Sequence, residues 1–183
     1  MKTKITAMKF SLITALLFIF TFSGFTQQDT KVNWYSFEEA VKLNKENPKK
    51  VLIDVYTDWC GWCKKMKKQT FNNPEIAQYI NENYYPVRFN AETNKKVQFK
   101  GRTFAKKEEG DRKPHDLAIA LLNGKMSYPS VAYLDGNNQL ITAVPGFYGP
   151  KEYETILKYF GRDIYKNKSY KDYKKQFENT LVE

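Results

Sequence analysis

Apolar and polar residues alternate with two different periods along this chain of 183 residues. Four short runs are β-branched, aromatic or apolar at successive positions, which predicts strands at 51–57, 85–90, 130–134 and 139–144. Elsewhere apolar residues return every three or four positions, which predicts helices at 36–47, 60–70, 73–83, 114–122 and 150–161. This order of elements indicates an α/β layer structure, with a central mixed sheet flanked by helices.

Capping and turn residues mark the ends of several elements. Ser36 with Glu39 fits a capping box at the start of the first helix, and Asn73 followed by a proline is typical of the start of the third. Gly161 is predicted to stop the fifth helix. The turn sequence at 135–138 joins the last two strands, so we expect them to pair as an antiparallel hairpin.

Two segments lie outside this regular pattern. Residues 91–124 form a long, polar connection that contains a possible small hairpin at 97–104 and a predicted loop at 106–113. Residues 162–183 are rich in lysine and tyrosine, and they predict one basic helix around 170–177 that packs on the surface of the domain. The sequence contains no internal repeat.

The first residues have the order of a secretory signal. Three lysines precede an apolar run at 10–22 and small residues follow it, so we expect a signal peptide at 1–26. The apolar run is shorter than the about 20 residues of a spanning helix, which leaves an uncleaved anchor as the alternative. Because no cysteine precedes Cys60, a lipid anchor on a mature N-terminal cysteine is excluded. We expect a periplasmic or secreted protein without stable membrane insertion.

Composition limits the class of protein further. Hydrophobic residues make up 42% of the chain and aromatic residues 16%, enough for the core of one domain, which we place at 27–161. A formal net charge of +10 would favour acidic partners, anionic membrane surfaces or nucleic acid. The lysines are spread over helices and loops, however, and export argues against nucleic acid. We therefore expect a solvated basic surface and no nucleic-acid partner.

The two cysteines of the chain, Cys60 and Cys63, lie where the first strand pattern changes into a lysine-rich helical pattern. Two intervening residues let both sulfur atoms lie on the first turn of one helix, close enough to form and break a disulfide. A structural disulfide is the alternative, but closing so short a loop stabilises a fold little. The spacing therefore favours redox chemistry.

Metal or haem chemistry fits these cysteines less well. A zinc site needs three or four nitrogen or sulfur ligands, and His115 is the single histidine of the chain. Covalent haem attachment needs a histidine directly after the second cysteine, where Lys64 stands. We expect no metal and no cofactor, and a surface role for His115 rather than a catalytic one.

Asp54 interrupts the apolar strand that leads to the cysteines. A carboxylate in a buried strand is costly unless it is paired or protonated. This position therefore requires a partner or a function.

Several of these features together resemble a thioredoxin-fold protein. The resemblance rests on the segment 54–64, on the Tyr128–Pro129 step before a strand and on Gly146 after the hairpin. It extends over about 34–160. It implies a thioredoxin-like α/β fold with a helical extension at its C-terminal end.

The sequences at 58–60 and 70–74 are similar to a narrower group of secreted thioredoxin-like proteins. That group resembles the C-terminal domain of the periplasmic disulfide reductase that carries electrons across the inner membrane. The sequence departs from thioredoxin at Gly61–Trp62, where thioredoxin has Gly-Pro. The connection at 91–124 is also longer, as an insertion before the strand that carries the cis-proline.

The resemblance implies different roles for the two cysteines. Cys60 would lie nearest the free amide groups of its helix, which favour a thiolate, and is the expected nucleophile. Cys63 is expected to resolve the mixed disulfide. Asp54 would lie behind the active site and help to deprotonate Cys63, or form an ion pair with Arg88 on the adjacent strand, or do both.

The resemblance also implies how a substrate is held. Pro129 is expected to be a cis-proline that faces the disulfide, which leaves the backbone of Tyr128 open to pair with an extended substrate. Trp59 and Trp62, with Gly61 between the cysteines, are expected to form an apolar rim. The alternative is that Trp59 packs as a core residue and only Trp62 meets the substrate.

The resulting hypothesis is an exported, monomeric thiol:disulfide oxidoreductase that reduces protein disulfides. Strongly oxidising or isomerising members of the family carry a histidine before the second cysteine, where this chain has Trp62. A reductase in an oxidising compartment needs an electron donor, so a membrane thiol-relay protein is the implied partner. The alternatives are a disulfide oxidase or isomerase, a binding module of the same fold, and a metal carrier that uses the two cysteines as soft ligands.

Overall fold

The structure is a computed structural model that describes residues 30–106 and 112–181. Its main sheet has the strand order β2-β1-β5-β6. The strands are β1 (Lys50–Tyr56), β2 (Tyr84–Asn90), β5 (Ser130–Leu134) and β6 (Leu140–Pro145). β2 runs parallel to β1, whereas β5 is antiparallel to both β1 and β6. The predicted mixed sheet and its C-terminal hairpin are confirmed.

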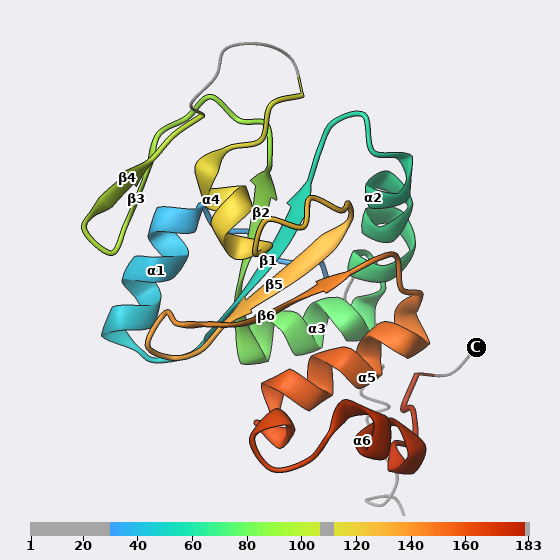
Figure 1. Ribbon diagram of the computed structural model, residues 1–183. Coiled ribbons are helices and arrows are strands. Elements are labelled where there is room, and N and C mark those ends of the chain that lie inside the picture. Colours follow the sequence, from blue (N-terminus) through green and yellow to red (C-terminus); the bar gives the residue numbers. More distant parts are fainter. Residues whose placement is uncertain (1–29, 107–111, 182–183) are drawn as a thin grey trace, which may run out of the picture.

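Helices cover both faces of this sheet (Figure 1). They are α1 (Phe37–Glu46), α2 (Gly61–Met66), α3 (Pro74–Asn83), α4 (Asp116–Leu121) and α5 (Pro150–Gly161). Val51, Ile53 and Val55 of β1 belong to the core under α1 and α4, and Leu52 belongs to the core under α2, α3 and α5. Because strand side chains alternate between faces, Asp54 lies on the same side as α2.

The predicted helix starts are confirmed by their caps. The Glu39 carboxylate accepts a hydrogen bond from the Ser36 backbone N–H at 2.8 Å, and the Ser36 hydroxyl accepts one from the Glu39 N–H at 3.2 Å. Asn73 caps α3 by accepting from the Glu75 N–H at 3.1 Å. These bonds satisfy amide groups that have no partner within their own helices.

Gly161 is the last residue of α5, but it does not adopt the left-handed conformation of the predicted stop. Its expected left-handed conformation is found instead at Asp163, two residues later, where φ is +59°. A Cβ atom at Gly161 would lie 2.6 Å from the Tyr79 hydroxyl oxygen. The glycine therefore permits close packing of α5 against α3, not a left-handed cap.

The predicted surface role of His115 is wrong. Its side chain is fully buried and caps α4: Nδ1 accepts from the Leu117 N–H at 3.1 Å, and Nε2 donates to the Lys95 carbonyl at 3.0 Å. Burial lowers the pKa of His115, which favours the neutral ring that this pair of hydrogen bonds requires. The histidine holds the inserted connection against the start of α4.

The connection at 91–124 contains the predicted hairpin, β3 (Val97–Phe99) with β4 (Arg102–Phe104). Phe99 packs edge-to-face on Phe37 of α1, with ring centres 5.0 Å apart. The hairpin therefore extends the core on the α1 side. Much of the predicted loop at 106–113 lies outside the described residues.

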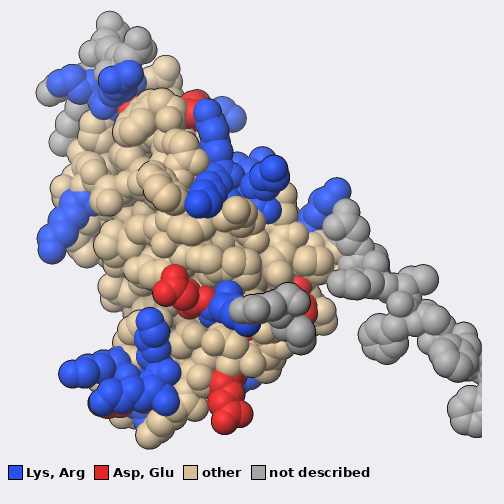
Figure 2. All heavy atoms as spheres, turned by 90° about the vertical axis from the view of Figure 1, so that its right-hand side faces the viewer, with Lys and Arg blue, Asp and Glu red and all other residues tan. Residues whose placement is uncertain are grey.

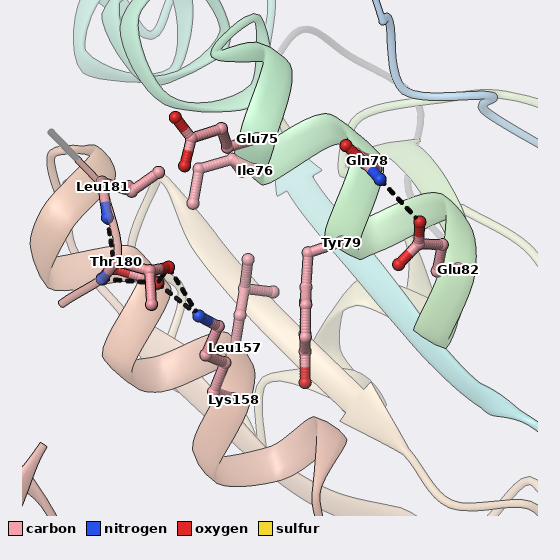
Figure 3. Close-up of a pocket in the computed structure, with 10 residues that line it drawn as sticks. Glu75, Ile76, Gln78, Tyr79, Glu82, Leu157, Lys158, Thr180 and Leu181 are labelled. Atoms are coloured by element: carbon pink, nitrogen blue, oxygen red, sulfur yellow. Dashed lines mark hydrogen bonds and ion pairs between the residues drawn. The ribbon is translucent and has the colours of Figure 1, made fainter. Parts of the chain in front are cut away.

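The C-terminal tail forms a short 3-10 turn (Ile164–Lys166) and then α6 (Tyr170–Gln176), as predicted. Its last described residues lie along α5, where the buried carboxylate of Glu154 accepts the Thr180 N–H at 3.1 Å and Leu181 joins the core (Figure 3). Beside them lies a hollow of about 220 Å³ between α3 and α5. The tail is thus attached to the domain.

The predicted signal peptide at 1–26 lies outside the described residues. Within 30–106 and 112–181, none of the helices has the length and apolar character of a membrane span.

Candidate active site at the start of helix α2

Cys60 and Cys63 form a disulfide at the point where β1 leads into α2, with their Cα atoms 5.3 Å apart. Cys60 is the N-cap of α2, and its Sγ accepts a hydrogen bond from the Cys63 backbone N–H at 3.0 Å. The same donor would stabilise a thiolate on Cys60. With the disulfide closed, both cysteines are nearly covered, since 5% of Cys60 and 2% of Cys63 are exposed.

Helix α2 continues directly into a π-helical turn, Lys67–Phe71, so the single helix predicted at 60–70 has two geometries. Met66 points into the core as predicted, and the last buried residue of the turn is Phe71. The Thr70 hydroxyl donates to the Tyr148 carbonyl at 2.6 Å. This bond ties the end of the cysteine helix to the segment that follows β6.

Two tryptophans stand exposed on either side of the disulfide. Trp59 is 54% exposed and Trp62 is 57% exposed, so the alternative that Trp59 is a core residue is wrong. Trp59 meets Tyr128 edge-to-face at 6.0 Å between ring centres, and Trp62 meets Phe147 at 5.4 Å. Large exposed apolar side chains such as these are typical of an interaction surface.

Polar residues that the sequence did not single out hold the tryptophans in place. The Trp59 Nε1 donates to the Glu92 carboxylate at 3.0 Å, and the Arg112 guanidinium lies 5.8 Å from the Trp59 ring centre. The Lys65 ammonium lies 4.8 Å from the Trp62 ring centre. Both Glu92 and Arg112 come from the inserted connection, where the sequence has no periodic pattern that would indicate them.

The Tyr128–Pro129 peptide bond is cis, the isomer that the resemblance implied. Pro129 directly precedes β5, and the Pro129 carbonyl accepts from the Gly146 N–H at 2.8 Å. Gly146 has a φ of +106°, which a residue with a side chain rarely adopts. Gly146 thus joins the end of β6 to Pro129, directly before β5.

Asp54 is buried, with 1% of its surface exposed, and its carboxylate accepts from Arg88 Nε at 2.9 Å. The two residues are register partners on β1 and β2. Burial raises the pKa of Asp54 to about 6, against the opposing charges of Arg88 and Lys67. The predicted ion pair is therefore present, and it leaves a carboxyl group that exchanges its proton close to neutral pH.

Arg88 has a second contact that sequence reasoning missed. Its guanidinium carbon lies 4.1 Å from the centre of the Tyr56 ring, so the cation stacks on the last residue of β1. This stacking fixes the side chain while Nε binds Asp54. The register of two adjacent strands, which the sequence alone does not provide, is what brings the three residues together.

The face that carries α2 is basic beside the cysteines. Exposed lysines stand on α2 and on the π-helical turn at Lys64, Lys65, Lys67 and Lys68. Figure 2 shows basic side chains at several places on this side of the molecule, including one group at the height of α2 and another at the height of α6. Positive potential near a cysteine favours its thiolate, although exposed charges are screened by salt.

Gly61 stands in open space, since a Cβ atom there would have no neighbour within 4 Å. The fold therefore does not require a glycine between the cysteines. Among the described residues, no group of three or more histidine, cysteine, aspartate or glutamate side chains is arranged to hold a metal ion.

The comparison with protein families finds one match over most of the chain. A family described as the thioredoxin-like domain matches residues 37–161, which includes every candidate site residue named above from Asp54 to Gly146.

Curated relatives match over shorter stretches. An uncharacterized protein of Archaeoglobus fulgidus is 37% identical over 65 residues, which are 36% of this chain and 51% of that protein. The thiol:disulfide interchange protein DsbD of Haemophilus ducreyi is 44% identical over 39 residues, 21% of this chain and 7% of DsbD. The chain thus spans about half the length of the first relative and a small part of the second.

Solved structures share the fold. A thioredoxin from Thermus thermophilus superimposes with a TM-score of 0.53 at 15% identity, covering 71% of this chain and 87% of that one. A thioredoxin-fold protein from Helicobacter pylori gives 0.52 at 23% identity, covering 71% and 80%. At these identities the likeness concerns the fold alone.

Proposed function

The chain belongs to the thioredoxin-like domain family, and from that premise we propose that it is an exported thiol:disulfide oxidoreductase that reduces disulfides in other proteins. The observation that carries the proposal is the hydrogen bond from the Cys63 N–H to the Cys60 Sγ at the start of α2. This donor, with the free amides of the helix start, stabilises negative charge on one sulfur of the pair.

The reaction runs in two exchanges. The Cys60 thiolate attacks one sulfur of the substrate disulfide, whose other sulfur leaves as a thiolate and takes up a proton. Cys63 then loses its proton and attacks the Cys60 sulfur of the mixed disulfide, which releases the second substrate thiol. The substrate gains two electrons and two protons, and the enzyme is left with the Cys60–Cys63 disulfide that the structure contains.

Asp54 is the proposed acceptor of the Cys63 proton. It lies on the strand face covered by α2, and its pKa of about 6 suits proton transfer near neutral pH. Arg88 is a positioning residue, because it holds the Asp54 carboxylate through Nε and is itself held by Tyr56.

The substrate is an extended segment that carries the disulfide. It would lie against the backbone of Tyr128 and Pro129, above Gly61, between the rings of Trp59 and Trp62. The exposed fractions of the two tryptophans, both above one half, support this assignment.

The direction of electron flow and the location are parts of the proposal. The absence of a histidine before Cys63 supports reduction. A membrane thiol-relay protein is the proposed electron donor, and the lysine-flanked apolar run at 10–22 supports export to the periplasm or beyond. The name of the DsbD relative, a thiol:disulfide interchange protein, agrees with this chemistry.

The decisive experiment uses the two cysteine variants. Cys60→Ser should abolish the reduction of insulin disulfides, because the remaining cysteine, Cys63, is only 2% exposed and lacks the position at the start of the helix that favours a thiolate. Cys63→Ser should accumulate mixed disulfides with its substrates, which can be trapped and identified. Normal turnover in either variant would refute the scheme.

The redox potential of the Cys60–Cys63 pair against glutathione tests the direction. A potential as oxidising as that of a dithiol oxidase would contradict the proposed reductase and favour a disulfide oxidase of the same fold.

A further inference from the structure

A second hollow opens beside Cys63, on the β2 side of the cysteine helix. Its volume is about 300 Å³, and its walls come from the residues after β1, from Arg88 on β2 and from the outer side of α2 and the π-helical turn. Tyr128 and Pro129 precede β5, the neighbour of β1 on the other side. The hollow is therefore distinct from the surface between Trp59 and Trp62 that is proposed to hold the substrate.

The charges around this hollow are strongly unequal. Lys64, Lys67, Lys68 and Arg88 line it, and the carboxylate that lines it is Asp58. Asp58 accepts a hydrogen bond from the Asn90 side chain at 2.9 Å. The hollow thus combines three exposed lysines and Arg88, whose Nε already binds the buried Asp54, with a single lining carboxylate that already has a donor.

A buried hydroxyl also lines the hollow without a partner. Thr57 is 1% exposed, and its Oγ1 has no hydrogen-bond partner among the described residues. Leaving such a group unpaired inside a protein costs about 1–3 kcal/mol. A hydroxyl beside four cations would gain most from an acceptor that also carries negative charge.

We propose that this hollow is an anion site that binds a carboxylate or a small oxyanion beside the resolving cysteine. The lysines and Arg88 supply the charge, and the Thr57 hydroxyl donates a hydrogen bond to the bound oxygen. The site does not depend on the proposed redox function, because its walls are complete in the oxidised protein. An anion there would place negative charge next to Cys63 and disfavour its thiolate.

The test is a titration of the oxidised, ¹⁵N-labelled protein with sodium sulfate, against sodium chloride at the same ionic strength. Saturable shifts of the backbone amide signals of Thr57, Cys63 and Lys64 are expected with sulfate alone. Lys64→Gln combined with Lys67→Gln should raise the sulfate Kd about tenfold. Lys171→Gln combined with Lys175→Gln removes the same charge from α6 and should leave the Kd unchanged.

Thr57→Val distinguishes a specific anion site from nonspecific attraction of sulfate to the lysines. It keeps all four cations and should raise the sulfate Kd severalfold, because only the hydrogen-bond donor is lost. Shifts that do not saturate, or that weaken equally in both pairs of lysine variants, would overturn the proposal. None of these measurements requires turnover, so a failure here is distinct from a failure of the cysteine variants.

A substrate series identifies the source of the anion. The reduced protein is assayed with an anionic disulfide, oxidised glutathione, and a neutral one, hydroxyethyl disulfide, each normalised to its reaction with a free dithiol. If the substrate supplies the carboxylate, a preference for oxidised glutathione should disappear in the Lys64 and Lys67 double variant. If a free anion is the ligand, the double variant should leave the normalised rates with both disulfides unchanged, while its sulfate Kd is still raised.

Discussion

Two carboxylates within the described part of the chain are buried beside a cation, and their pKa values are shifted in opposite directions. At the active site, Asp54 pairs with Arg88 and has its pKa raised to about 6. Under the C-terminal tail, Glu154 pairs with Lys158 and has its pKa lowered to about 2. A buried ion pair alone therefore does not decide how a carboxylate behaves.

The number of hydrogen-bond donors explains the difference. Burial raises the pKa of both groups, but at Asp54 it is opposed chiefly by the single donor Arg88. At Glu154 it is outweighed by donors from Lys158, Thr180 and Asn179, including the backbone N–H of Thr180. A buried carboxylate with one donor can exchange its proton near neutral pH. A buried carboxylate with several donors stays charged and, at Glu154, holds the C-terminal tail against α5.

The largest effect is expected from Glu154→Gln, which keeps the shape and removes the charge. It should lower the free energy of unfolding by about 3 kcal/mol at pH 7, because Lys158 is left buried without its counter-ion. Urea denaturation followed by tryptophan fluorescence measures the loss. Glu152→Gln, an exposed carboxylate on the same helix, is the matched control and should change stability little.

The pH dependence of this loss follows from the sign of the pKa shift. A carboxylate whose folded pKa is depressed stabilises the fold above its unfolded pKa, near 4.5 for Glu154, and this is lost as the pH falls towards 2. Wild type and Glu154→Gln should therefore converge in stability below pH 4. A difference that stays constant down to pH 3 would contradict the proposed charge role.

Asp54→Asn should have the opposite effect and raise the free energy of unfolding at neutral pH. Because the folded pKa of Asp54 is raised, the wild-type fold is penalised as the pH rises from about 4 to 6, and the full penalty is present at pH 7. The variant should therefore be more stable by up to about 3 kcal/mol at pH 7 and little more stable at pH 4. Asp58→Asn, an exposed carboxylate four residues away, is the control for the substitution itself.

The same Asp54 variant should slow the step in which Cys63 resolves the mixed disulfide. The rate of that step, measured by stopped flow between pH 5 and 8, should lose its dependence on a group with a pKa near 6. A variant that is more stable yet has an unchanged pH profile would leave Asp54 as a buried charge without a catalytic role.

These two carboxylates also differ in how far the sequence could predict them. Asp54 stood out because a charged residue interrupts a continuous apolar strand, and Arg88 followed from the resemblance. Glu154 did not stand out, because a glutamate in a surface-type helix with tyrosine and leucine neighbours is ordinary. Its burial depends on Thr180 and Leu181, some 26 residues along the chain, which no local pattern connects to it.

The elements themselves followed from periodicity and caps, since strands and helices are determined largely by local pattern. Contacts made by the irregular connection were among those missed: the buried cap of His115 and the hydrogen bond from Trp59 to Glu92. Such contacts depend on where the connection at 91–124 packs against the rest of the domain, and a segment without a periodic pattern does not reveal this. The sequence identified the cysteine pair and the cis-proline, but not the residues of the connection that contact Trp59 and cap α4.

The smallest expected effect comes from removing one hydroxyl beside Glu154. Thr180→Val removes the hydroxyl that donates to the carboxylate and that accepts from Lys158 at 2.9 Å, but it keeps the backbone N–H at 3.1 Å and the volume of the side chain. Since Lys158 and Asn179 still donate, the variant should lose about 1 kcal/mol at pH 7, well below the loss in Glu154→Gln. The Glu154 pKa, followed by carboxyl carbon NMR, should rise and yet stay below that of Asp54. A loss as large as that of Glu154→Gln would mean that one donor dominates, and the number of donors would then not explain the difference between the two sites.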